Sequence, residues 1–151
     1  MKVHDKLYIN GAWTPSRSAA SIEVRNAATE EVIARVPAGT PEDTDHAARS
    51  ARAAFVPWAA TLVAQRAALL QGIADGLAGR ADEIARAITG EVGMPLKLSR
   101  RIQAALPPQV MAGYAQLVRE YPFEERIGNT LVIKEPVGVV WAITPWNYPL
   151  H

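Results

Sequence analysis

The stretch that decides the fold is VGVVWAITPWNYPL, residues 137–150. Residues 137–143 are almost continuously apolar and rich in β-branched side chains, which is typical of a strand buried on both faces of a parallel sheet. The run ends at Thr144-Pro145, because proline has no N–H for a ladder and disfavours helix in the residue before it. Pro149 suits the first turn of a helix. The pattern therefore predicts a buried strand, a short loop and a helix start.

The predicted loop is the part of the sequence that is most informative about chemistry. In open α/β sheets, ligands bind beyond the carboxyl ends of the strands, where this loop lies. Its one side-chain amide belongs to Asn147, between Trp146 and Tyr148. A loop asparagine often does no more than bond its own backbone. The amide by itself therefore does not identify a site.

A longer block, from Pro136 to Leu150, resembles the first Rossmann strand and following loop of the NAD(P)-dependent aldehyde dehydrogenases. Shorter matches with the order and spacing of the same family are YINGAW at 8–13, NAATE at 26–30, F-x-x-W at 55–58 and EVGMP at 91–95. The resemblance implies an α/β, Rossmann-like fold, of which this chain holds the N-terminal part: small strands, a helical group, a hairpin and the first parallel strand.

The same resemblance implies a division of the chain into three parts. Residues 1–122 would be the N-terminal part of the cofactor-binding domain, and residues 123–136 a hairpin that contributes to oligomerisation. Residues 137–151 would carry the first Rossmann strand and the P-W-N loop, in a domain that is incomplete. The expected full-length assembly is a homodimer or homotetramer.

The function implied by the resemblance is oxidation of an aldehyde to a carboxylic acid with NAD or NADP. Asn147 would donate a hydrogen bond to the oxyanion formed when a cysteine attacks the aldehyde. A neutral donor stabilises that charge, whereas an aspartate would repel it. Ile143, Thr144, Pro145 and Trp146 would line the cofactor groove, although Trp146 could also be a core residue. The sequence does not decide between NAD and NADP, and it does not identify the aldehyde.

The 151 residues contain no cysteine, so a disulfide, a thiolate metal site and a cysteine nucleophile are all excluded within them. We interpret the chain as the N-terminal part of a protein several times longer, and expect the chain alone to be inactive. Two alternatives stay open. One is a non-catalytic family member or fragment that serves subunit contact, and the other is an acylating relative that requires CoA or phosphate.

Composition excludes other function classes. The chain has 16 basic and 15 acidic residues, which gives no electrostatic basis for binding nucleic acid or an anionic membrane. No apolar run approaches the roughly 18 residues needed to cross a bilayer, and the N-terminus MKVHDK has no secretory signal. The sequence therefore predicts a soluble, cytoplasmic protein. The three histidines lack neighbouring ligands, so we predict no metal site.

Local signals predict the remaining elements. Asn10-Gly11 predicts a type I′ hairpin turn, and Thr40-Pro41 predicts a helix start. In a second helix, predicted at about 61–77, Gly72 and Gly76 suggest close helix packing. Further segments are strands at 21–25 and 31–36 around a turn at 26–30 that we expect to be looser than the family's, helices at about 61–77 and 81–89, a helix kinked or restarted at Pro107-Pro108, and a hairpin turning at 127–129.

Overall fold

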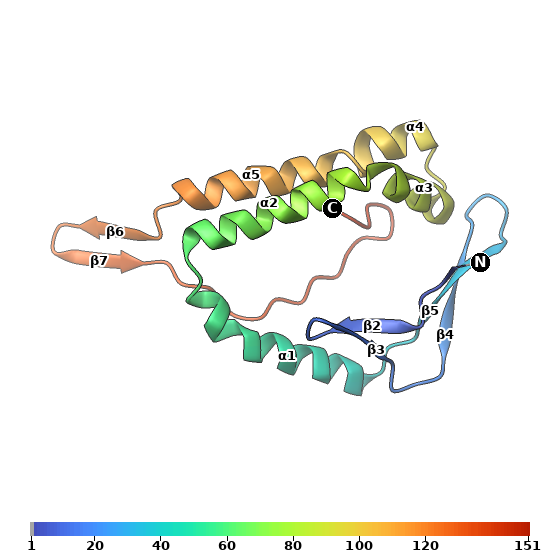
Figure 1. The fold of residues 1–151 in the computed structure, drawn as a ribbon, viewed down its shortest axis with the longest axis horizontal. Coiled ribbons are helices and arrows are strands. Elements are labelled where there is room, and N and C mark those ends of the chain that lie inside the picture. Colours follow the sequence, from blue (N-terminus) through green and yellow to red (C-terminus); the bar gives the residue numbers. More distant parts are fainter. Residues whose placement is uncertain (1) are drawn as a thin grey trace.

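The computed structural model describes residues 2–151 (Figure 1). Helices α2 and α5 lie side by side and antiparallel, with a hairpin projecting beyond one end and the N-terminal strands near the other (Figure 1). The strands are β1 (Lys2–Val3), β2 (Lys6–Ile9), β3 (Ala12–Pro15), β4 (Ser21–Arg25), β5 (Val32–Pro37), β6 (Glu124–Ile127) and β7 (Thr130–Ile133). The helices are α1 (Pro41–Ala59), α2 (Val63–Gly79), α3 (Ala81–Val92), α4 (Leu96–Leu98), the π-helix η1 (Ser99–Gln103) and α5 (Leu106–Glu120).

The N-terminal strands form two small sheets. β2 and β3 pair antiparallel around Asn10 and Gly11, whose φ angles of 55° and 76° give the predicted type I′ turn. β4 pairs antiparallel with β5, and β1 pairs parallel with β5 on its other edge. The two predicted strand pairs are therefore confirmed.

Hydrogen bonds hold the turn between β4 and β5. The Asn26 side-chain oxygen accepts hydrogen bonds from the backbone N–H groups of Ala28 (2.8 Å) and Thr29 (3.1 Å). The N–H of Glu30 donates to the Asn26 carbonyl over 2.9 Å. These bonds accompany a φ of 62° at Glu30, a conformation that favours glycine, and a turn looser than the family's stays a prediction.

Helix α1 begins as predicted, with Thr40 as its N-cap and Pro41 in its first turn. Asp43 closes a capping box with Thr40, and it is only 5% exposed. The same carboxylate also accepts hydrogen bonds from the Ser16 hydroxyl (2.7 Å) and the Arg17 N–H (3.2 Å) in the loop after β3. Asp43 therefore fastens the loop between the two sheets to the start of α1.

Replacing Asp43 by asparagine in the full-length protein is expected to lower Tm by about 5 °C or more at pH 7. The Ser16 hydroxyl, and the N–H groups of Thr40 and Arg17, hold the pKa of the Asp43 carboxyl below its ordinary value. A group with a depressed pKa in the folded state stabilises the fold above its unfolded pKa, and this contribution is lost as the pH falls through the folded pKa.

The Tm difference between the parent and the Asp43→Asn protein should therefore narrow below about pH 4. Thermal melts between pH 7 and pH 3 measure it. Asp45→Asn is the matched control, because the Asp45 carboxylate is exposed and pairs with Arg49, one turn along the same helix. A Tm difference that is the same at both ends of this pH range would contradict the role of the Asp43 charge.

The core between the helices consists of small side chains. Ala67 and Ala74 of α2 and Ala115 of α5 are buried where these two helices pack. The predicted role of Gly72 and Gly76 in this packing was wrong. A Cβ atom added at either glycine would meet no atom within 4 Å, because alanines on another face of α2 make the close approach.

Of the two outcomes predicted for the proline pair, a kink or a restart of the helix, the structure shows the restart. Pro107 lies in the first turn of α5, where its missing N–H costs no helical hydrogen bond. The preceding turn was not predicted. It is the π-helix η1, in which the N–H of Ala104 donates to the carbonyl of Ser99, five residues earlier, over 2.9 Å.

The hairpin predicted around residues 127–129 is formed by β6 and β7, with Gly128 at a φ of 60°. It projects from the end of α5, away from the helices and the N-terminal strands (Figure 1). The side chains of Ile127, Leu131 and Ile133 are exposed. The hairpin therefore presents apolar surface on an extended arm.

The strand predicted over residues 137–143 is not formed, and this prediction was wrong for the described chain. The segment runs back from the β6–β7 hairpin without strand pairing (Figure 1), and Val137 is 95% exposed. A strand requires a neighbour to pair with, and no described strand lies beside this one. The helix predicted to start at Pro149 is likewise only a turn, in which the N–H of His151 donates to the carbonyl of Tyr148 (3.1 Å).

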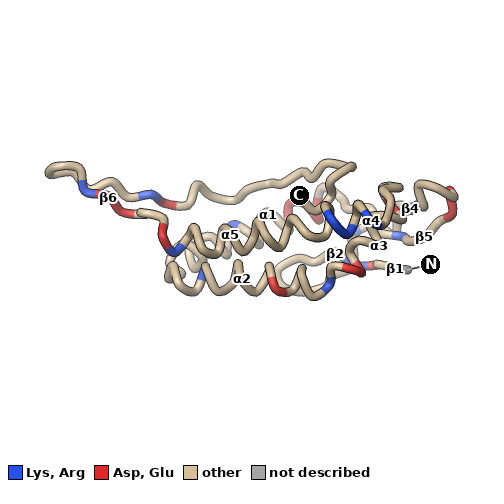
Figure 2. The backbone as a smooth tube through the Cα atoms, turned by 90° about the horizontal axis from the view of Figure 1, so that it is seen from above, with Lys and Arg blue, Asp and Glu red and all other residues tan. Residues whose placement is uncertain are grey.

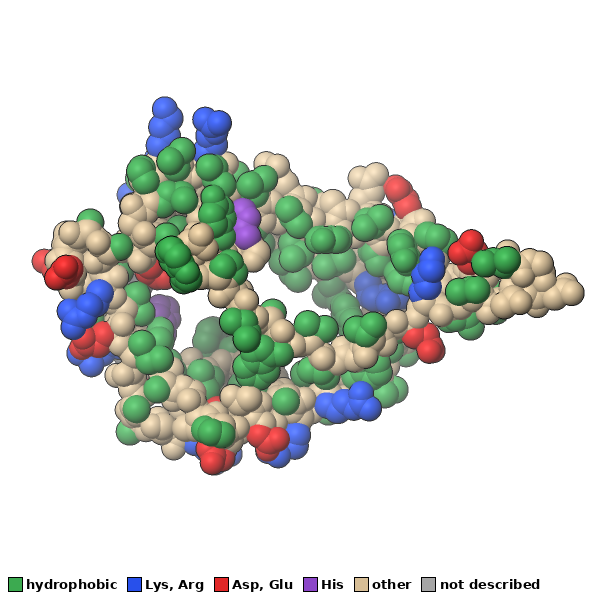
Figure 3. Space-filling view, turned by 180° about the vertical axis from the view of Figure 1, so that it is seen from behind, with side chains coloured by type: hydrophobic (Ala, Val, Ile, Leu, Met, Phe, Trp, Pro, Cys, Tyr) green, Lys and Arg blue, Asp and Glu red, His purple; other side chains and the backbone are tan. Residues whose placement is uncertain are grey.

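Much of the apolar surface of the described chain is uncovered. Residues 136–150 contain no charged side chain, so the final segment forms an uncharged track along the molecule (Figure 2). Hydrophobic side chains gather around a hollow in the middle of the molecule (Figure 3). Among the described residues, no helix is both long enough and apolar enough to cross a membrane.

Candidate active-site loop

The predicted site loop is fixed to the helical group at its backbone. The side-chain nitrogen of Gln103 donates a hydrogen bond of 2.9 Å to the carbonyl oxygen of Asn147. Immediately after it, the rings of Tyr148 and His151 meet edge to face, with their centroids 5.1 Å apart. The loop therefore has a defined path even though the segment before it has no strand pairing.

The five predicted site residues are consecutive and exposed. Ile143 is 87% exposed and Trp146 is 85% exposed, and Thr144 and Pro145 between them are exposed as well. The alternative of a core Trp146 is therefore wrong for the described chain. Asn147 is also exposed, so its side chain is accessible to a reactant.

Sequence reasoning missed Gln103, which has no exposed surface in the structure. It lies 44 residues from Asn147 in the chain. The π-turn of η1 determines which residues of this segment face the interior. No local sequence signal marks such a turn.

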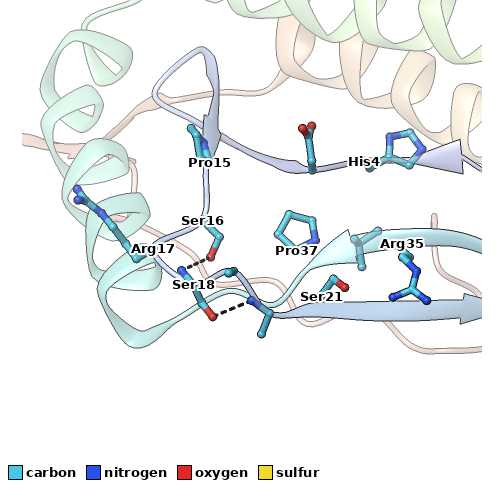
Figure 4. Close-up of a pocket in the computed structure, with 12 residues that line it drawn as sticks. His4, Pro15, Ser16, Arg17, Ser18, Ser21, Arg35 and Pro37 are labelled. Carbon is cyan, nitrogen blue, oxygen red and sulfur yellow. Dashed lines mark hydrogen bonds between the residues drawn. The ribbon is translucent and has the colours of Figure 1, made fainter.

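A second candidate site is a pocket of about 440 Å³ among the N-terminal strands, lined in part by His4, Ser16, Arg17 and Arg35 (Figure 4). The Ser16 hydroxyl is already engaged, because it donates to the Asp43 carboxylate (2.7 Å) and accepts from the N–H of Ser18 (3.2 Å). No hydrogen bond joins His4 to these serines among the described residues. Among the described residues, the pocket therefore offers no hydrogen-bonded pair of a serine and a histidine.

Charged pairs near the loop have structural roles. Arg100, in η1, donates to the Asp82 carboxylate of α3 over 2.7 Å, and Arg86 donates to the same group over 2.8 Å. Because Arg100 is engaged in this way, it acts as a link between two helices and not as a phosphate clamp. No group of three histidine, aspartate or glutamate side chains in the described part of the chain could hold a metal ion.

Comparison with known proteins decides the family. The sequence model described as "Aldehyde dehydrogenase family" matches residues 13–151. The chain belongs to the aldehyde dehydrogenase family. It is 42% identical, over its whole length, to the 3-succinoylsemialdehyde-pyridine dehydrogenase of a Pseudomonas species. It is 43% identical to a putative aldehyde dehydrogenase of Staphylococcus aureus strain bovine RF122 / ET3-1. It spans 32% of the length of each of these two aldehyde dehydrogenases.

Solved structures of the family agree with the fold. A mutant aldehyde dehydrogenase C from Pseudomonas syringae, solved with NAD+ and octanal, aligns with a TM-score of 0.94 and 39% identity over 97% of this chain and 30% of that one. A Mycobacterium tuberculosis aldehyde dehydrogenase, solved with NAD+, aligns with a TM-score of 0.92 and 35% identity over 99% of this chain and 32% of that one. The α/β, Rossmann-like family assignment is therefore confirmed.

Proposed function

We propose that this chain is the N-terminal part of an aldehyde dehydrogenase that oxidises an aldehyde to a carboxylic acid with NAD or NADP. The observation that carries the proposal is the P-W-N loop of a family member, with an exposed Asn147 whose backbone is tied to the helical group. The cysteine nucleophile would come from residues outside this chain, so the 151 residues alone would be inactive.

In the proposed reaction, the thiolate adds to the aldehyde carbon and the carbonyl electron pair moves onto the oxygen. The Asn147 amide donates a hydrogen bond to that oxyanion. The bound nicotinamide supplies the hydride acceptor. Water then releases the acid, so the balance is aldehyde, water and NAD(P)+ giving acid, NAD(P)H and a proton.

The cofactor would lie against residues 143–146. Ile143 and Trp146 fit this role, because their apolar side chains are largely exposed and available to form the wall of a groove. Thr144 and Pro145 would contribute through the backbone and through apolar contacts.

The proposed domain organisation is unchanged: residues 1–122 belong to the cofactor-binding domain, residues 123–136 form a subunit-contact hairpin, and residues 137–151 begin the Rossmann sheet. The projecting β6–β7 arm with its exposed apolar side chains supports the second assignment. A homodimer or homotetramer is the proposed assembly, and a cytoplasmic location stays a prediction.

The test is a product assay of the full-length protein with short and medium-chain aldehydes and each cofactor. We expect reduction of NAD or NADP with a free carboxylic acid as product and without added CoA or phosphate. An acyl-CoA or acyl phosphate product would favour the acylating alternative. No cofactor reduction with any aldehyde under any of these conditions would favour the non-catalytic alternative.

A further inference from the structure

A hydrogen bond joins the fully buried side chain of Gln103 to the backbone of Asn147 in the site loop. The Asn147 carbonyl can only accept a hydrogen bond, so the Gln103 side-chain nitrogen must face it. The other half of the Gln103 amide, its Oε1 atom, is buried and finds no donor among the described residues. The loop contact therefore accounts for the orientation of this amide.

The element that carries Gln103 is itself held in place. Gln103 ends the π-helix η1, whose first residue, Ser99, is also fully buried. The Ser99 hydroxyl accepts a hydrogen bond from Thr89 of α3 over 2.9 Å. Arg100, the next residue, reaches Asp82 of the same helix over 2.7 Å. Two contacts therefore attach η1 to α3: a hydrogen bond at the buried Ser99 and an exposed ion pair at Arg100.

Stability alone does not explain a glutamine at this position. A buried amide with an unpaired oxygen is destabilising compared with an apolar side chain of the same shape. π-turns themselves occur often at functional sites, because they reposition a side chain at some energetic cost. The unpaired amide oxygen and the π-turn both indicate that Gln103 serves to hold the backbone of Asn147 and does not serve stability.

We infer that Gln103 is a positioning residue, which fixes the backbone of Asn147 and so directs the Asn147 amide toward the reacting oxygen. The inference rests on the proposed function, since it acts only through Asn147. A donor stabilises a transition state well only if its direction is fixed before the reaction. Misplacement by about 1 Å can cost up to about a hundredfold in rate.

The first test replaces Gln103 by methionine, which has a similar length and no donor, in the full-length enzyme. We expect kcat to fall by about 10- to 100-fold, KM to change less than threefold, and Tm to stay within about 3 °C of the parent. Gln109→Met is the matched control, because Gln109 is an exposed glutamine on α5, six residues further along the chain. It should leave both kcat and Tm unchanged.

The second test is Gln103→Glu, which also serves if the methionine variant fails to fold. A carboxylate would repel the Asn147 carbonyl, whereas a protonated carboxyl can donate its O–H to the same oxygen. Burial raises the pKa of such a carboxyl, so its protonation falls in an accessible pH range. The kcat of Gln103→Glu relative to the parent should therefore rise as the pH is lowered from 9 to 6. A ratio independent of pH would overturn the inference.

A double variant separates this inference from the proposed function. If Gln103 acts through Asn147, then Gln103→Met combined with Asn147→Ala should be no slower than Asn147→Ala alone. A slow Asn147→Ala enzyme with a normal Gln103→Met enzyme overturns the inference and leaves the proposed function standing. Normal kcat in the Asn147→Ala enzyme overturns both. Fully multiplicative losses in the double variant would show that Gln103 acts elsewhere, and would also overturn the inference.

Discussion

Replacing Asn147 by alanine in the full-length enzyme is expected to lower kcat for aldehyde oxidation by about 10²- to 10³-fold. The physical reason is the loss of one preorganised donor to an oxygen that gains negative charge in the transition state. Binding of the aldehyde in its ground state places little charge on that oxygen, so KM should change much less than kcat. Single-turnover formation of reduced cofactor measures the loss directly.

Two further variants sharpen this prediction. Asn147→Asp has nearly the shape of the parent but presents a negative charge, so it should be at least as slow as Asn147→Ala. Gln116→Ala removes an exposed side-chain amide from α5 and should leave kcat unchanged. A loss of less than tenfold in Asn147→Ala, with hydride transfer still rate-limiting, would remove Asn147 from the proposed role.

The elements that could be predicted from the sequence are those with local causes. Asn10-Gly11 supplies two positive φ angles within one turn, and Thr40-Pro41 supplies a cap and a compatible first residue. Pro107 stops one helix and suits the start of the next. In each case two or three neighbouring residues determine the geometry, so no knowledge of the rest of the fold is required.

The features that could not be predicted depend on residues far apart in the chain. The contact of Gln103 with Asn147 spans 44 residues, and that of Asp43 with Ser16 spans 27. The Asn147 loop was identified through its family resemblance, whereas the residue that holds it was not. The apolar run 137–143 has the composition of a buried strand but no partner among the described residues, so composition alone did not produce the strand.

Because the apolar run 137–143 has no strand partner within the described residues, a second prediction concerns residues 1–151 expressed alone. We expect them to aggregate or to fold only in part, because apolar side chains are exposed along the final segment and on the helices. Size-exclusion chromatography with light scattering and binding of a hydrophobic dye measure this. A monomeric chain with a cooperative melt and well-dispersed amide NMR signals would contradict the prediction.

Charge substitutions in the final segment should have opposite effects on the 151-residue chain and on the full-length enzyme. Val137→Lys with Val140→Glu should increase the monomeric fraction of the 151-residue chain, because both side chains are exposed there. In the full-length enzyme the same pair should abolish soluble, active protein, because a central Rossmann strand would bury both charges without partners. If the full-length enzyme tolerated both charges, the segment would not be a buried strand, and the position assigned to Asn147 at its carboxyl end would have to be abandoned.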